Sequence, residues 1–381
     1  MHDAVIVGAR CAGSPLAMLL ARAGHNVLVV DRATFPSDTM STHFIQSPGM
    51  LRLARWDLSD ALFATGSPPV TKAFFDIGGA EMEVDIPVQE PVTALTSPRR
   101  TVLDKMLLDA ATNAGAEVAE GVSVDSLIFE DERVVGIRGH DSKGGFEAKG
   151  RIVIGADGRH SLVAREVDAP FVEFTEALTS GYYSYYANTG ITRTQVFFRD
   201  DIASIMFPTH DDLTVVAMIW RRESFKELRR DIEGNVNKAL AGLGGQGEVV
   251  LAGERAERFI GAADLANYLR KTSGPGWALV GDACYHKDPI PADGISDAFR
   301  GAEMLAEALD AIFTGSETEG EALAGYDGRY REVADAHLDP AVRSARFDLS
   351  PKERGDAFFE SRLLDHQEVA AMIGATEHAS G

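Results

Sequence analysis

The sequence contains only two cysteines, Cys11 and Cys284. Two cysteines in 381 residues cannot form a disulfide framework, and such scarcity is typical of proteins from a reducing cytoplasm. No Cys and His residues recur at the spacing of a structural metal site, so we expect no bound metal. The scarcity of thiols therefore predicts a cytoplasmic protein that is stabilised neither by cross-links nor by metal ions.

Long apolar runs and an excess of basic charge are also missing. No apolar segment reaches the roughly 18 residues that a membrane-spanning helix requires. The chain enters a strand-like run at Ala4, which leaves no room for a signal peptide before it. Lysine and arginine total 37 against 58 aspartates and glutamates, a formal net charge of -21. This charge disfavours nucleic acids and anionic membranes as partners, and we interpret it mainly as a contribution to solubility.

The composition that is present is that of an ordinary globular protein, with 45% hydrophobic and 25% charged residues. A length of 381 residues predicts two or three linked domains. Residues 4–7 read as a buried strand, a glycine turn follows, and apolar residues then recur at helical spacing over residues 16–23. Residues 26–30 read as a second strand that closes on Asp31. The chain therefore opens with a strand–turn–helix–strand unit.

The turn in this unit has the glycine pattern of a dinucleotide-binding site. Its sequence is Gly8-Ala9-Arg10-Cys11-Ala12-Gly13. In such a site the first glycine allows a tight turn, the last lets helix and strand approach, and the helix N-terminus receives a pyrophosphate. Asp31 would hydrogen-bond a ribose with a free 2′-hydroxyl, which favours FAD or NAD over NADP. Arg10 replaces the middle glycine, where its guanidinium can balance phosphate charge; the alternative is a structural turn in another α/β fold.

A second motif follows the buried strand at residues 277–280. Its sequence is Gly281-Asp282-Ala283-Cys284-Tyr285-His286-Lys287-Asp288-Pro289-Ile290-Pro291-Ala292-Asp293-Gly294. Asp282 is placed to accept hydrogen bonds from the hydroxyls of a ribityl chain. A helix that begins near Gly294 would direct its N–H groups at the flavin pyrimidine edge, where a helix N-terminus favours reduced, anionic flavin. An NAD site does not need this element, so the motif favours FAD.

A third motif, Asp157-Gly158, follows the strand-like run 151–155. An Asp-Gly pair at a strand end is often only a turn. Here Ser161 can cap the helix that follows, and Arg165 lies one turn further on.

In this order and at these separations, the three motifs resemble those of the group A flavoprotein monooxygenases of the para-hydroxybenzoate hydroxylase (PHBH) fold. Relatives of that family include geranylgeranyl-reductase-like and halogenase-like oxidoreductases. The resemblance covers roughly residues 1–345. It implies an α/β fold with a Rossmann-like FAD-binding domain of the GR2/PHBH type and an inserted antiparallel-sheet substrate domain. The implied cofactor contacts are Gly8, Arg10, Cys11, Ala12, Gly13, Asp31, Arg32, Arg100, Val124, Asp157, Gly158, Asp282, Pro289, Gly294 and Ile295.

The chain departs from the family pattern in three respects. Ser161 and Arg165 are four positions apart instead of three, although both spacings keep two residues on one helix face. Asp293 stands where a small or amide residue is more usual. The Trp-x-Trp-x-Ile-Pro signature of tryptophan-halogenase relatives is absent, which argues against halogenation.

The resemblance also divides the chain. We expect an FAD-binding domain of residues 1–71, 99–170 and 266–345, a substrate domain of residues 72–98 and 171–265, and a C-terminal helical tail of residues 346–381. A capping box at Ser350 predicts where the helix of the tail begins. The aromatic-rich stretch 178–222 reads as an antiparallel sheet. We expect Phe207, Pro208 and Trp220 of this sheet to contact an apolar or aromatic substrate.

The reaction implied is that of a monooxygenase. NAD(P)H would reduce FAD, O₂ would add at flavin C4a, and the hydroperoxide would hydroxylate or epoxidise an aromatic or polyene small molecule. Two alternatives remain: reduction of double bonds, as in the prenyl reductases, and a flavin-binding protein without turnover. His43 is a candidate acid or base if it lies near the flavin, against the simpler interpretation that it has no catalytic role.

Overall fold

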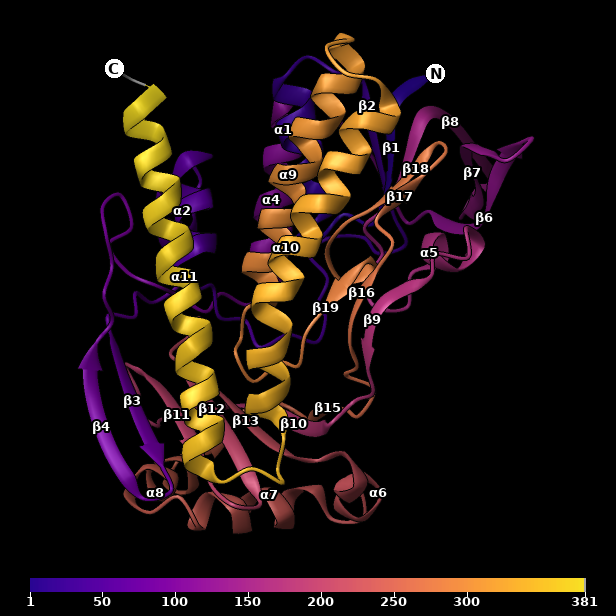
Figure 1. The fold of residues 1–381 in the computed structure, drawn as a ribbon. Coiled ribbons are helices and arrows are strands. Elements are labelled where there is room, and N and C mark those ends of the chain that lie inside the picture. Colours follow the sequence, from indigo (N-terminus) through magenta and orange to yellow (C-terminus); the bar gives the residue numbers. More distant parts are fainter. Residues whose placement is uncertain (380–381) are drawn as a thin grey trace.

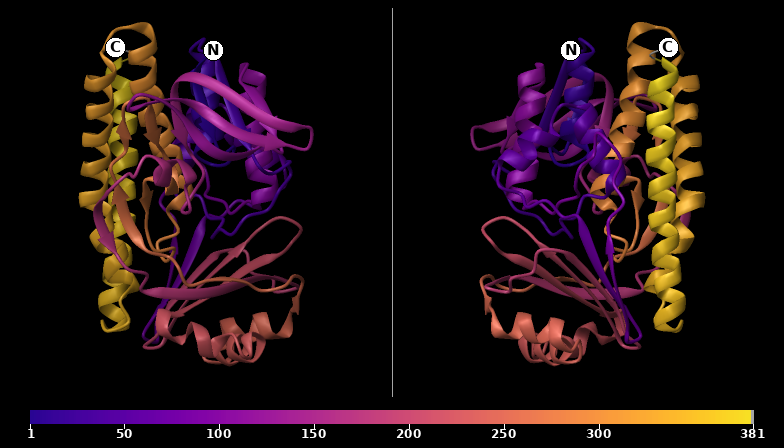
Figure 2. Two further views of the ribbon diagram at one scale, coloured as in Figure 1. Left: turned by 90° about the vertical axis from the view of Figure 1, so that its right-hand side faces the viewer. Right: turned by 90° about the vertical axis from the view of Figure 1, so that its left-hand side faces the viewer.

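A computed structural model describes the backbone of residues 1–379 and the side chains through Ala375. Two parts of the chain are stacked along the long axis of the molecule (Figure 1). One is built on a mainly parallel sheet and the other on an antiparallel sheet. Both chain ends lie far from the antiparallel sheet (Figure 2). This is the mixed α/β architecture, with one mainly parallel sheet and a second, antiparallel sheet, that the motifs predicted.

The parallel sheet carries the cofactor motifs. Its strands are β1 (His2–Val7), β2 (Val27–Asp31), β5 (Glu117–Glu120), β6 (Ser123–Glu130), β7 (Arg133–Asp141), β8 (Gly144–Gly155), β17 (Ser273–Gly274) and β18 (Trp277–Leu279). The order is β17-β18-β8-β1-β2-β5, in which β18, β8, β1, β2 and β5 are parallel, and β6 and β7 extend β8 as an antiparallel ribbon. Residues 4–7 are all buried and apolar, as is typical of a central strand in a parallel sheet.

Helices surround this sheet. They are α1 (Gly13–Arg22), α2 (Ser47–Arg55), α3 (Ser59–Ala64), α4 (Arg100–Ala114), α5 (Leu162–Glu166), α9 (Gly294–Thr314) and α10 (Glu319–Ala345), with the short turn η2 (Gly281–Ala283). Helix α1 packs between α4 and α9. Helix α4 ends at Gly115, whose φ of 106° is in the left-handed region that glycine tolerates.

The second sheet separates two apolar clusters. Its strands are β3 (Lys72–Ile77), β4 (Ala80–Asp85), β10 (Thr179–Ala187), β11 (Thr194–Phe198), β12 (Ile202–Pro208), β13 (Thr214–Arg221), β14 (Glu254–Arg255) and β15 (Ile260–Ala262). The order is β14-β10-β13-β12-β11-β3-β4, with β15 beside β10. The turn η1 (Arg222–Ser224) leads to α6 (Phe225–Leu228), α7 (Ile232–Ala241) and α8 (Gly245–Ala252), which cover one face of the sheet. The other face lies toward the part that is built on the parallel sheet (Figure 1).

A third, small sheet lies between the two parts. It consists of β9 (Phe171–Thr175), β16 (Asn267–Arg270) and β19 (Tyr285–His286) in the order β19-β16-β9. Residues 171–175, expected in the substrate domain, instead form β9, which pairs with β16 and not with the large antiparallel sheet.

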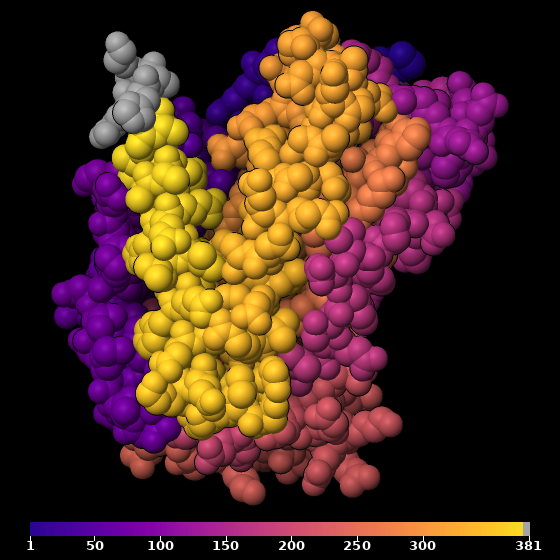
Figure 3. All heavy atoms as spheres, viewed as in Figure 1, coloured from indigo at the N-terminus to yellow at the C-terminus, as the bar shows by residue number. Residues whose placement is uncertain are grey.

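The C-terminal segment is a single long helix, α11 (Pro351–Ala379). Ser350 and Glu353 form the predicted reciprocal cap, since each side chain bonds the other residue's backbone N–H. The helix packs on α10, α2, β3 and β11, and it forms much of the front surface in Figure 3. Phe358 of this helix is buried, whereas Leu363 is 56% exposed.

Candidate functional site

The three sequence motifs meet at one edge of the parallel sheet. Gly8 follows β1, Asp31 ends β2, Asp157 follows β8, and Asp282 follows β18. Because these strands are parallel, their carboxyl ends lie side by side. Ligands of open α/β sheets bind outside this edge. Residues from four separate segments are thus placed around a single site.

The glycine turn is too crowded for side chains at its two ends. A Cβ on Gly8 would lie 2.3 Å from the Ala156 carbonyl oxygen, and Gly8 has a φ of 106°. A Cβ on Gly13 would lie 1.8 Å from the Gly8 carbonyl oxygen. A Cβ on Gly281 would lie 2.8 Å from the Ala12 Cβ. The first and second motifs are therefore in direct contact, and α1 begins at the turn with its N-terminus toward the shared edge.

Asp31 holds the start of this turn. Its carboxylate accepts hydrogen bonds from the backbone N–H groups of Ala9 and Ala33, both at 2.8 Å. The Asp31 carbonyl accepts a hydrogen bond from the Val122 N–H at 2.9 Å. Strand β6, which carries Val124, therefore begins close to the end of β2. Arg32, the next residue, is exposed. An acid here lies where the ribose of a dinucleotide is bound.

Arg10 is tied to helix α4 instead of standing free. Its Nη1 donates to Asp104 Oδ2 at 2.6 Å, and its Nη2 donates to the Ser37 hydroxyl at 3.0 Å. Arg100 also binds Asp104, with two hydrogen bonds of 3.0 Å, and the Cys11 thiol donates to it at 3.3 Å. Asp104 is fully buried. The sequence analysis did not single it out, although its spacing of four from Arg100 on a helix is a recognisable signal.

Asp157 accepts hydrogen bonds from the first turn of helix α5. Its Oδ2 accepts from the N–H of Leu162 at 2.7 Å and of Val163 at 3.3 Å, and burial raises its pKa. Ser161 caps α5 as predicted, by accepting from the Ala164 N–H at 2.9 Å. Arg165 is exposed and donates to the His160 carbonyl. In this structure Asp157 therefore organises the edge of the site.

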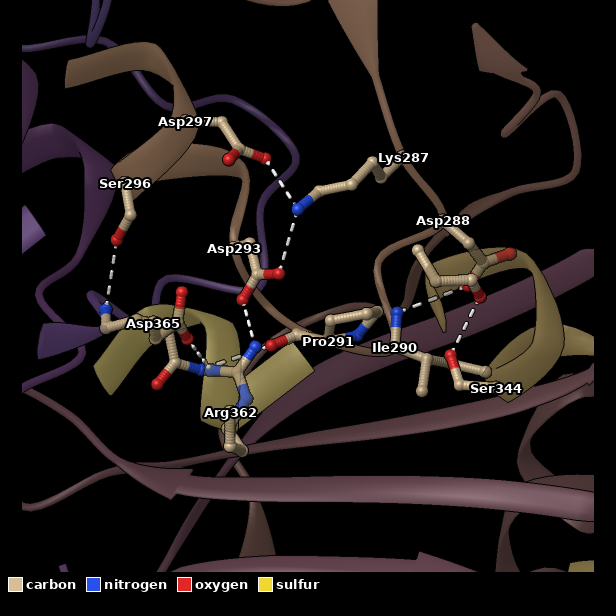
Figure 4. Close-up of polar contacts among 12 residues, drawn as sticks. Lys287, Asp288, Ile290, Pro291, Asp293, Ser296, Asp297, Ser344, Arg362 and Asp365 are labelled. Carbon is tan, nitrogen blue, oxygen red and sulfur yellow. Dashed lines mark hydrogen bonds and ion pairs between the residues drawn. The ribbon is translucent and has the colours of Figure 1, made fainter. Parts of the chain in front are cut away.

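The loop between Pro289 and Gly294 leads into α9. Ala292 has a φ of 57°, so this loop turns through a left-handed residue. Gly294 is exposed, and a Cβ on it would meet nothing within 4 Å, which leaves the N-terminus of α9 open. Ile295 is buried behind it. The preceding residue, Asp293, is buried and pairs with Lys287 at 2.9 Å and with Arg362 of α11 (Figure 4).

His43 is completely buried and neutral. Its Nδ1 lies 2.7 Å from the Ser41 carbonyl oxygen, which can only accept, so Nδ1 carries the proton. Its Nε2 therefore accepts from the Tyr185 hydroxyl at 2.6 Å. Burial lowers the pKa of His43 to about 3. With both nitrogens engaged, His43 has the geometry of a residue that positions Tyr185.

An apolar pocket of about 330 Å³ lies between the antiparallel sheet, the loop at 290–292 and α11. Its wall includes Phe44, Phe75, Val196, Ile205, Phe207 and Phe359. The Phe207 ring stacks on Phe44, with centroids 4.6 Å apart. Of the three expected substrate contacts, Phe207 is in the wall, whereas Pro208 ends the same strand and is not among the residues that line the pocket. Trp220 lies on the opposite face in the cluster under α6–α8, because side chains alternate along a strand, so we withdraw it as a substrate contact.

These residues fit FAD. The absence of side chains at Gly8 and Gly13 allows the tight turn and the close packing of helix on strand that a dinucleotide-binding motif requires, and the N-terminus of α1 lies at this turn. An acid lies at the end of β2, and two helix N-termini, those of α1 and α9, open on the same side of the sheet. In the described part of the chain, no group of three or more His, Cys, Asp or Glu side chains is arranged to hold a metal ion. No described helix has the length and apolarity to cross a membrane.

Fold and site together define a flavin-dependent oxidoreductase. The chain belongs to the family described as "FAD binding domain", whose model matches residues 1–341. The protein is therefore an FAD-dependent enzyme of the PHBH-like group, and the resemblance deduced from the three motifs is confirmed.

The chain is similar to proteins of different reactivity. The chain is 25% identical to tryptophan 2-halogenase of Chondromyces crocatus over 96% of this chain and 71% of the relative. It is also 25% identical to digeranylgeranylglycerophospholipid reductase 2 of Methanopyrus kandleri, over 98% of this chain and 93% of the relative. The structure of PqsL, a probable FAD-dependent monooxygenase from Pseudomonas aeruginosa, is similar with a TM-score of 0.78, 20% identity, and coverage of 94% of this chain and 99% of PqsL. The similarity to PqsL establishes the fold and not the reaction.

Proposed function

We propose that this enzyme is a monooxygenase that hydroxylates or epoxidises an aromatic or polyene small molecule, with NAD(P)H as electron donor and O₂ as oxygen source. The observation that carries the proposal is the apolar pocket, which abuts the loop assigned to the flavin and is lined by Phe44, Phe207 and Phe359. Oxygen transfer from a reduced flavin requires a substrate held close to the ring in a site without water.

The residues around the sheet edge would hold the cofactor. The N–H groups at the start of α1 would bind the pyrophosphate, Asp31 the adenosine ribose and Asp282 the ribityl hydroxyls. The open N-terminus of α9 at Gly294 would face the pyrimidine edge and favour its negative charge. The bound FAD would supply the redox chemistry, by carrying electrons from the donor to O₂.

The protein would supply orientation and exclusion of water. Phe207 and Phe44 form one stacked wall of the pocket, and Ile290 and Pro291 form the side next to the cofactor loop. His43 would hold the Tyr185 hydroxyl in place without itself exchanging protons near neutral pH, because burial keeps its pKa far below that range, at about 3.

A second candidate is the reduction of isolated double bonds. It is supported by the similarity to the digeranylgeranylglycerophospholipid reductases, which extends over nearly the whole chain, and by the apolar character of the pocket. Both reactions would use the same pocket and the same cofactor. They differ in whether the reduced flavin gives its electrons to O₂ or to a carbon–carbon double bond.

Oxygen uptake separates the two. The FAD-loaded protein, reduced by NADH, NADPH or dithionite, would be mixed with panels of two-ring aromatic compounds and polyenes in the presence of isotopically labelled O₂. We expect at least one compound to accelerate oxygen uptake and to gain a labelled oxygen atom, detected by mass spectrometry. A product that gains two hydrogens without oxygen would support the reductase instead. Absence of both products across the panels would contradict the pocket assignment.

A further inference from the structure

The apolar pocket has charged side chains on only one wall. Of the residues that line it, the ionisable ones are Arg362, Asp365 and His366, and all three come from helix α11. Asp365 lines the pocket and is only 5% exposed. A buried carboxyl in the wall of an apolar pocket is costly unless it has a partner or a function.

The partner that Asp365 has is already engaged. Its Oδ2 lies 2.9 Å from Arg362 Nη1, while Nη2 of the same guanidinium pairs with Asp293 (Figure 4). Asp293 also pairs with Lys287 at 2.9 Å. One arginine is thus shared between two buried carboxylates, and Asp365 is the one that faces the pocket.

The other charged groups around Asp365 come from three elements. Lys287 and Asp293 belong to the loop before α9, and Arg300 is on α9 itself. His366 follows Asp365 on α11, and its pKa is lowered by burial. Burial, opposed by Arg362 and aided by Asp293, raises the pKa of Asp365 to about 7. Asp365 can therefore either hold or accept a proton at neutral pH.

We propose that Asp365 is the base that accepts a proton from a hydroxyl group of a two-ring aromatic substrate bound in this pocket. The inference deepens the proposed function and rests on it for the oxidative step. In the proton transfer, the substrate O–H bond breaks, the proton moves to a carboxylate oxygen of Asp365, and the electron pair stays on the substrate oxygen. The ring becomes richer in electrons, and no oxidant or reductant takes part.

The size of the pocket supports a two-ring substrate. An apolar cavity of about 150 Å³ holds one benzene ring, and the pocket here has about 330 Å³. Its walls are mainly aromatic and aliphatic, with Phe44 and Phe207 stacked on one side. Gln46, Ser47 and Thr194 add uncharged polar groups elsewhere, but the charged side chains are confined to α11, and a charged wall would orient such a molecule with its hydroxyl group toward that helix.

Binding of a probe tests the inference without turnover. The FAD-loaded protein would be dialysed against 2-naphthol and, as a matched control, against 2-methoxynaphthalene, which lacks the O–H donor. Measurements at about pH 5.5 and about pH 8.5 span the titration of Asp365, and the probe stays neutral because phenols ionise near pH 10. We expect 2-naphthol to bind about tenfold more tightly at the higher pH, where the ionised carboxylate accepts its hydrogen bond. The ether should bind equally at both.

Variants assign the effect to one residue. Asp365→Asn should remove the pH dependence of 2-naphthol binding, Asp365→Glu should restore it, and His366→Gln should leave it in place. Failure of 2-naphthol to bind, equal binding at both pH values in the unmodified protein, or a pH dependence that persists in Asp365→Asn would overturn the inference. The comparison in the unmodified protein stands even if a variant does not fold.

The outcome separates this inference from the proposed function. Binding that depends on pH, in a protein that never takes up oxygen, would contradict the monooxygenase proposal and leave Asp365 as a ligand-binding group. Oxygen uptake with 2-naphthol bound equally at both pH values would contradict the role of Asp365 alone.

Discussion

Arg362 of the C-terminal helix forms an ion pair with Asp293, the residue that precedes helix α9 and lies 69 positions earlier in the chain. The same guanidinium pairs with Asp365 one turn along α11. Asp293 ends the loop assigned to the flavin pyrimidine edge. Its ion pair with Arg362 therefore links α11 to the cofactor site. This link gives α11 a part in the site as well as in the packing of the molecule.

Removal of Arg362 should destabilise the protein strongly. Arg362→Met leaves two buried carboxylates without their shared partner, which costs about 3–5 kcal/mol. Urea unfolding followed by tryptophan fluorescence would measure the loss. The matched control is Lys352→Met, which removes the exposed ion pair of Lys352 with Asp356 on the same helix and should change stability little. Equal effects of the two substitutions would show that the Arg362 pairs are not important.

Asp282→Ala should weaken FAD retention more than Asp157→Ala. Asp282 is assigned to the ribityl chain, and the loss of an enclosed hydrogen bond from a charged group costs about 1.5–3 kcal/mol of binding. Asp157 instead caps α5, so its replacement should lower the free energy of unfolding by about 1 kcal/mol and affect FAD indirectly. Flavin released on dialysis, together with urea unfolding of both variants, checks the two roles. Greater flavin loss from Asp157→Ala would reverse them.

Phe207 and Trp220 should respond differently to replacement by leucine. Phe207 borders the apolar pocket, whereas Trp220 lies across the sheet under α6–α8. Phe207→Leu should reduce the affinity for 2-naphthol several-fold, because an aromatic wall contributes about 0.5–1.5 kcal/mol beyond its buried area. Trp220→Leu should lower stability and leave this affinity unchanged. Equilibrium dialysis of the folded variants would decide, and a loss of affinity only in the tryptophan variant would place the ligand elsewhere.

Acid should weaken the contact between α11 and the FAD-binding part through Glu368. Burial alone would raise the pKa of Glu368, but its ion pairs with Arg300 and Arg52 outweigh this and lower the pKa to about 2. The stability that this group contributes is present above its ordinary pKa of 4.5 and is lost as the pH falls from there toward about 2. The free energy of unfolding of the unmodified protein should therefore fall more steeply over this window than that of Glu368→Gln. Parallel acid titrations of the two proteins would contradict the assignment.

Much of the cofactor site could be predicted from the sequence because its determinants are local. Gly8, Gly13 and Asp31 lie within one strand–turn–helix–strand unit, whose periodicity and turn chemistry are encoded in consecutive residues. Gly281 and Asp282 follow another buried strand, and Ser350 begins a helix through a four-residue cap. The buried charges near them were not predicted. Asp104 contacts Arg10 across 94 positions, and nothing in the residues beside either one indicates the pair.

The sequence alone determined that this chain builds an FAD-binding parallel sheet with a second antiparallel sheet, since strand periodicity, glycine turns and helix caps depend on neighbouring residues. Tertiary structure alone decided which face of the second sheet borders the pocket, and so separated Phe207 from Trp220. It also decided that Asp365, which no sequence motif marks, is buried in the pocket wall, whereas Leu363 of the same wall is largely exposed. The physical reason is that burial and ion pairing depend on which distant surfaces meet, and periodicity within one helix does not specify its partner.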